Sequence, residues 1–176
     1  MITLDFETEA IEGNPLFSPP KPVGLAVRWA GGHCEYFTKF TDMELAWQEL
    51  MESDKELLFH NAPFDLSVGC KHLGGEWPTW ERIHDTMYLL FLADPYAWSL
   101  SLKPSAELYL NEPPEEQDLL KEWILANVPS ATKKTWGAYI CLAPEEIVRP
   151  YAIGDVERTY NLYTYLTQEL MDGEDH

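Results

Sequence analysis

The first eight residues, Met1–Thr8, constrain this chain more than any other stretch. Apolar and polar side chains alternate along them, and this period of two predicts a β-strand that buries one face and presents the other. Asp5 and Glu7 then point the same way. Neighbouring carboxylates repel each other unless a cation holds them, and carboxylate oxygens are ligands that Mg²⁺ and Mn²⁺ prefer. The stretch predicts a metal site, and the alternative is a strand end whose polar face meets water.

The size and composition of the chain predict one folded domain spanning residues 1–176. Hydrophobic residues make up 45% of the sequence, which favours a globular protein over a disordered one. No apolar run approaches the roughly 20 residues that span a bilayer, and Met1 leads directly into a strand without a signal peptide. We therefore expect a soluble, cytoplasmic protein that does not bind membranes.

The net charge is −18, from 30 acidic and 12 basic residues. Such a charge repels a polyanion over most of the surface and by itself disfavours nucleic acid as a partner. A small groove that is cationic or filled with metal can still bind a phosphate backbone locally. The net charge therefore leaves nucleic-acid binding open.

The order of the expected elements predicts an α/β domain, with a mixed sheet flanked by helices. After the first strand and a proline-rich loop, the pattern predicts strands at 23–29, 34–40 and 57–59, and a further strand near 80–83. Helices are expected from residue 41 or 42 to 53 and over 61–73, 87–93, 101–110, 115–127 and 144–171, the last interrupted at Pro150. Residues 129–136 are expected to form a solvated loop, and the alternative is that Trp136, Lys133 and Lys134 in it contact the bases and phosphates of a single strand.

Asn61 and Asp65 follow the apolar run at 57–59. We expect Asn61 to cap the next helix and Asp65 to lie in its first turn. Free backbone N–H groups at a helix start favour anions, so a phosphate would also be favoured there. The alternative is that Asp65 simply complements the helix dipole.

Tyr151 and Asp155 are four residues apart and therefore lie on one face of the last expected helix. Asp155 is at the border of an apolar stripe that would pack on the sheet. An acid in that position is costly unless it is hydrogen-bonded or bound to metal. The alternative is a surface aspartate beside a core tyrosine.

Three motifs occur in order along the chain: D-x-E at Asp5 and Glu7, N-x-x-x-D at Asn61 and Asp65, and Y-x-x-x-D at Tyr151 and Asp155. Together they resemble the motifs of the DEDDy 3′-to-5′ exonucleases. That group includes the proofreading domains of bacterial DNA polymerase I and related phage polymerases, and the ribonuclease D type enzymes. The sister group has a histidine five residues before the last aspartate, where this chain has Pro150. The resemblance covers residues 2 to about 170.

The resemblance implies a ribonuclease H-like fold and a two-metal mechanism with Mg²⁺ or Mn²⁺. Asp5 would bridge both ions, Glu7 and Asp155 would complete the first, and Asp65 would hold the second largely through waters. Tyr151 would orient the attacking water. The implied reaction releases nucleoside monophosphates from the 3′ end of nucleic acid.

Single-stranded DNA is the favoured substrate, and a separate DNA polymerase is the partner if the chain is a stand-alone proofreading subunit. Thr8 and Glu9 are candidates to contact the terminal sugar, and Asn61 and Phe64 to contact the sugar-phosphate and a base. Phe64 fits the core equally well. The alternatives are a ribonuclease D-like exoribonuclease, another phosphoryl-transfer enzyme of this fold, and a catalytically idle binding or architectural module.

Overall fold

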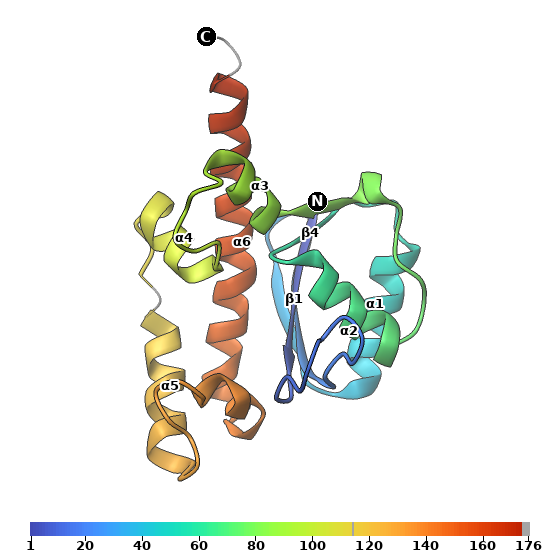
Figure 1. Ribbon diagram of the computed structural model, residues 1–176. Coiled ribbons are helices and arrows are strands. Elements are labelled where there is room, and N and C mark those ends of the chain that lie inside the picture. The colour runs from blue at the N-terminus through green and yellow to red at the C-terminus, as the bar shows by residue number, and fades with distance from the viewer. Residues whose placement is uncertain (114, 174–176) are drawn as a thin grey trace.

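The protein has a central five-stranded mixed sheet with helices on both faces, as seen in a computed structural model that describes residues 1–113 and 115–173 (Figure 1). The sheet order is β3-β2-β1-β4-β5. The strands β1, β2 and β3 are antiparallel neighbours, while β4 and β5 run parallel to β1. The strands are β1 (Ile2–Thr8), β2 (Pro22–Arg28), β3 (Cys34–Phe37), β4 (Leu57–Phe59) and β5 (Ile83–Asp85). The predicted α/β architecture is confirmed.

Two layers of helices enclose the sheet (Figure 1). Helices α1 and α2 cover one face, and α6 covers the other, with α3, α4 and α5 packed on α6. The helices are α1 (Phe40–Glu52), α2 (Ala62–His72), α3 (Thr86–Ala93), α4 (Leu102–Leu110), α5 (Glu115–Asn127) and α6 (Glu145–Gly173). Two 3₁₀ helices lie at Trp80–Arg82 and Trp136–Leu142.

Strand β1 is covered on both faces, which corrects the expectation that its polar face is presented. The apolar side chains of β1 belong to the core with α1 and α2, where the rings of Phe6 and Trp47 are 5.6 Å apart. Asp5 and Glu7 point to the opposite side, toward α6, because successive strand residues alternate between faces. Glu7 is only 5% exposed. The carboxylates therefore lie between the sheet and a helix, where an unpaired charge is costly.

Helix α6 continues through Pro150 without the predicted interruption. Proline lacks an N–H donor, so it removes the hydrogen bond to the carbonyl of Glu146 four residues earlier. Both residues are exposed, so water can hydrogen-bond that carbonyl. After this point the helix buries Ala152, Val156 and Leu166 against the rest of the protein. This burial favours continuing the helix in one piece.

The boundaries of β3, α1 and β5 also differ from the sequence prediction. Strand β3 ends at Phe37, and α1 begins at Phe40 after Lys39, whose side chain makes no capping hydrogen bond. The strand expected near 80–83 begins only at Ile83, because Ile83–Asp85 is the segment that pairs with β4. Such shifts reflect pairing between distant segments, which local patterns do not encode.

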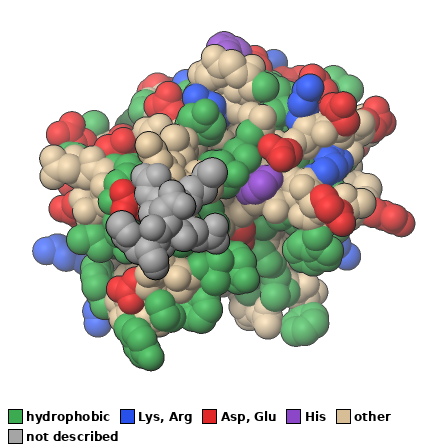
Figure 2. All heavy atoms as spheres, turned by 90° about the horizontal axis from the view of Figure 1, so that it is seen from above, with side chains coloured by type: hydrophobic (Ala, Val, Ile, Leu, Met, Phe, Trp, Pro, Cys, Tyr) green, Lys and Arg blue, Asp and Glu red, His purple; other side chains and the backbone are tan. Residues whose placement is uncertain are grey.

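Figure 2 shows hydrophobic, acidic and basic side chains interspersed over one end of the molecule. The exposed aromatic residues of α3 include Tyr88 and Phe91. None of the described helices is both long enough and apolar enough to cross a bilayer.

Candidate active site

Asp5, Glu7 and Asp155 converge in space. In the sequence, Asp155 on α6 comes 148 residues after Glu7 on β1. One carboxylate oxygen from each lies within 4.8 Å of the other two. The strand places Asp5 and Glu7 on its α6 side, and α6 crosses that face with Asp155 pointing back at the strand. Asp155 is 6% exposed. The structure thus brings together three of the four predicted acids in one cluster.

Burial and mutual repulsion raise the pKa values of these carboxyl groups. Burial, followed by the charge of Asp155, raises the pKa of Asp5 to about 7. Burial, followed by the charges of Asp5 and Asp155, raises the pKa of Glu7 well above its ordinary range. Burial also raises the pKa of Asp155, while the Lys103 ammonium opposes that rise. At neutral pH, full ionisation of the cluster therefore requires additional positive charge.

The cluster fits a divalent cation on two further grounds. Glu7 Oε1 is buried and has no hydrogen-bond partner among the described residues. Such an oxygen is an orphaned acceptor on one of the three clustered carboxylates. Carboxylate oxygens alone form a hard donor set, which suits Mg²⁺ or Mn²⁺ better than softer metals.

Asp65 lies beside this cluster and is tied to the backbone between its two strand members. It is 1% exposed, and its Oδ1 accepts a hydrogen bond of 2.9 Å from the N–H of Phe6. Burial, followed by the charge of Asp5, raises the pKa of Asp65 well above its ordinary range. Asp65 therefore lies near Asp5, but it does not join the three-carboxylate cluster.

Asp85 replaces Asn61 as the capping group of α2. Asn61 stands at the N-cap position in the left-handed conformation, at φ 75°, and its side chain makes no capping hydrogen bond. Instead Asp85 accepts from the backbone N–H groups of Asn61, Ala62 and Met87, each at 2.9 Å. One carboxylate thus fixes the starts of both α2 and α3, and α2 carries Asp65. The predicted side-chain cap by Asn61 was wrong, and Asp85, the last residue of β5, was the available sequence signal.

Tyr151 lies one helical turn before Asp155 and is 9% exposed, and Lys103, which contacts Asp155, also lies over the Tyr151 ring. The ring meets Trp136 edge to face, with centroids 6.4 Å apart, and Lys103 Nζ lies 4.1 Å from its centroid. Trp136 therefore contacts the site instead of belonging to a solvated loop. Burial, followed by the charges of Asp155 and Glu7, raises the pKa of Tyr151 above its ordinary value. The hydroxyl is a neutral hydrogen-bonding group at neutral pH and not a base.

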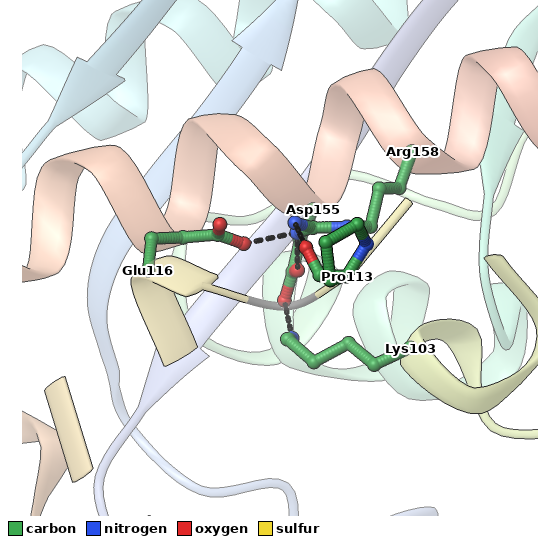
Figure 3. Close-up of polar contacts among 5 residues, drawn as sticks. All are labelled: Lys103, Pro113, Glu116, Asp155 and Arg158. Carbon is green, nitrogen blue, oxygen red and sulfur yellow. Dashed lines mark hydrogen bonds and ion pairs between the residues drawn. The ribbon is translucent and has the colours of Figure 1, made fainter. Parts of the chain in front are cut away.

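Two basic residues flank Asp155, and sequence reasoning assigned a role to neither (Figure 3). Lys103 on α4 donates from Nζ to Asp155 Oδ2 at 2.5 Å. Arg158, three residues along α6, contacts Asp155 Oδ1 at 3.5 Å and donates to Glu116 and to the carbonyl oxygen of Pro113. The i,i+3 spacing of Asp155 and Arg158 was the available signal for one contact. The α4 contact depends on tertiary packing.

A cavity of about 390 Å³ opens beside Glu7. Thr8, Glu9 and Phe64 line it, as does Lys134 from the segment before the second 3₁₀ helix. Phe64 also packs against the core of α1 and α2, as the core interpretation predicted, and its contact with a base stays a prediction. The residues lining the cavity do not include Asn61, whose contact with substrate stays a prediction.

The sequence matches no protein-family model and no curated protein, but solved structures share its fold. Brucella melitensis NrnC bound to pGG superposes with a TM-score of 0.66 at 19% identity. NrnC with bound Mg²⁺ gives 0.64 at 19% identity, and a structure described as the apo form of the nuclease gives 0.64 at 17%. Each match covers 98% of this chain and 74% of the other.

This chain has the ribonuclease H-like fold. The sheet order, the layers and the near-complete coverage by NrnC agree on that point. At this level of identity the similarity concerns architecture. Function has to be argued from the residues of the site.

Proposed function

We propose that this protein is a metal-dependent 3′-to-5′ exonuclease that hydrolyses single-stranded DNA to nucleoside monophosphates. The observation that carries the proposal is the convergence of Asp5, Glu7 and Asp155 within 4.8 Å, next to a cavity that begins at Glu7. The similarity to NrnC with bound Mg²⁺ supports it. The DEDDy motifs supply the proposed direction of hydrolysis.

The four acids would hold two divalent cations. Asp5, Glu7 and Asp155 would hold the first, and Asp5 and Asp65 the second. When bound, such a pair of ions stabilises the charge that develops on the attacking and leaving oxygens at phosphorus. The raised pKa values of Asp5, Glu7 and Asp65 support cation binding, because ionising these carboxyl groups together requires positive charge.

The remaining residues would position the substrate. Tyr151 donates a hydrogen bond to the attacking water and does not abstract its proton, since its pKa is raised. The terminal nucleotide occupies the cavity beside Glu7, with its sugar near Thr8 and Glu9 and its base against Phe64. Lys134 alone carries a positive charge among the described residues of the cavity lining. We therefore expect few phosphate contacts and weak, distributive binding.

The second candidate is hydrolysis of RNA. The observation that favours it is the similarity to NrnC bound to pGG. The cavity does not separate the two substrates, because its lining offers contacts to the sugar-phosphate backbone and to a base face, which DNA and RNA share.

The test uses 5′-labelled single-stranded DNA, matched RNA and matched duplex, each incubated with Mn²⁺ or Mg²⁺. A ladder shortening from the 3′ end, with mononucleotide product, supports the proposal. Asp5→Asn and EDTA should both abolish the ladder, whereas the exposed control Asp54→Asn should leave it unchanged. No ladder, or a ladder that survives both Asp5→Asn and EDTA, would refute the assignment. The relative rates on DNA and RNA decide between the two candidates.

A further inference from the structure

Arg158 links Asp155 to a segment that the proposed mechanism does not use. Its side chain is 8% exposed and lies between α6 and the start of α5 (Figure 3). Nη2 donates to the carbonyl oxygen of Pro113 at 3.2 Å, and Nη1 donates to Glu116 Oε1. Nη1 also faces Asp155 Oδ1, but at 3.5 Å, the limit of a hydrogen bond. The guanidinium is therefore drawn toward Glu116 and away from Asp155.

Gly154 makes room for this arrangement. A Cβ at that position would lie 2.9 Å from Glu116 Oε1 and 3.0 Å from Arg158 Nη1. Real Cβ atoms do not tolerate the shorter of these contacts, so a side chain there would displace the pair. Gly154, directly before Asp155, therefore leaves room for Glu116 and Arg158 to meet.

The position of this guanidinium decides how available Asp155 is to a metal ion. A guanidinium paired closely with a carboxylate occupies its oxygen atoms and cancels its charge, so it competes with a cation for that ligand. Asp155 already has Lys103 at Oδ2. If Arg158 closed onto Oδ1 as well, both oxygens of Asp155 would be paired with protein cations.

We propose that Glu116 is a positioning residue that holds the Arg158 guanidinium and so keeps Asp155 available to a divalent cation. The inference rests on the proposed metal site and adds to it a control of metal affinity from α5. Glu116 does not touch the metal or the substrate. Its effect passes through Arg158, so removing Arg158 as well should cancel the effect of losing Glu116.

The test measures Mn²⁺ binding by isothermal titration calorimetry without substrate. We expect Glu116→Gln to raise the Kd for Mn²⁺ by roughly tenfold or more, because Arg158 is released onto Asp155. Gly154→Ala should raise the Kd in the same direction without changing any charge. The double variant Glu116→Gln/Arg158→Met should return the Kd to within about threefold of wild type. Circular dichroism confirms that each variant is folded.

The matched control is Glu145→Gln, which breaks the Arg149–Glu145 ion pair on the same helix at exposed positions. It should leave the Kd unchanged. A Glu116→Gln variant with the wild-type Kd would overturn the inference, and so would a double variant that binds Mn²⁺ as weakly as Glu116→Gln. If Glu116 and Arg158 act only by linking α5 to α6, the double variant should bind Mn²⁺ as weakly as Glu116→Gln does. The reason is that removing both partners does not restore the link.

The nuclease assay separates this inference from the proposed function. A normal 3′ ladder combined with unchanged Mn²⁺ affinity in Glu116→Gln rejects the inference and leaves the function. The expected pattern of Mn²⁺ affinities without any ladder rejects the exonuclease and leaves the inference. A wild-type protein that does not bind Mn²⁺ rejects both.

Discussion

Replacing Asp5 by asparagine should abolish activity and at the same time stabilise the metal-free protein. The pKa of Asp5 rises from 3.8 to about 7 on folding, through burial and then the charge of Asp155. Between these pH values the folded protein binds a proton that the unfolded chain does not. The contribution of Asp5 to stability is therefore greatest at low pH and falls as the pH rises from about 4 to about 7.

The size of the stabilisation follows from the same pKa values. The difference between the unfolded and folded pKa values of Asp5 lowers the free energy of unfolding by about 4 kcal/mol above pH 7, relative to low pH. Asp5 keeps some contact with solvent, and a buried asparagine amide has its own desolvation cost. We therefore expect Asp5→Asn to recover about 2 kcal/mol at pH 8, which corresponds to about 4 to 8 °C in Tm for a chain of this size.

The assay is thermal unfolding in EDTA at pH 8 and pH 5, followed by circular dichroism. The gain in Tm should be largest at pH 8 and shrink toward pH 5, where wild-type Asp5 is already protonated. Mn²⁺ should stabilise the wild type more than the variant. The control Asp54→Asn, at a side chain that is 92% exposed, should show no gain. A gain of equal size at both pH values, or a loss of stability at pH 8, would refute the electrostatic reasoning.

Three further predictions concern residues around the cluster. Lys103→Gln should lower the Kd for Mn²⁺ by about tenfold, because it removes the ammonium that contacts Asp155 Oδ2; calorimetry would contradict this with an unchanged or higher Kd. Tyr151→Phe should reduce kcat by about ten- to a hundredfold with unchanged Mn²⁺ affinity, and loss of metal binding would show a structural role instead. Asp85→Ala removes three hydrogen bonds from backbone N–H groups and should cost about 2 to 4 kcal/mol in urea unfolding; a cost below 1 kcal/mol would contradict the shared cap.

The sequence alone was sufficient to predict the sheet, most helices and the residues of the carboxylate cluster. The alternation around Asp5 and Glu7 predicted a strand, and the spacing of Tyr151 and Asp155 predicted one helical face. These patterns are local, with periods of 2 and 3.6 residues, so they can be read without knowing the fold. The order of the three motifs then favoured a fold in which they meet.

Only the tertiary structure decided what surrounds those residues. It showed that β1 is covered on both faces, that Asp85 and not Asn61 caps α2, and that α6 continues past Pro150. It also placed Lys103 and Glu116 around Asp155. The hydrogen bonds of Asp85 to the start of α2 and of Lys103 to Asp155 join residues 23 to 52 positions apart, so they depend on tertiary packing. Local periodicity specifies which face of an element is polar, but packing decides which distant side chains meet it.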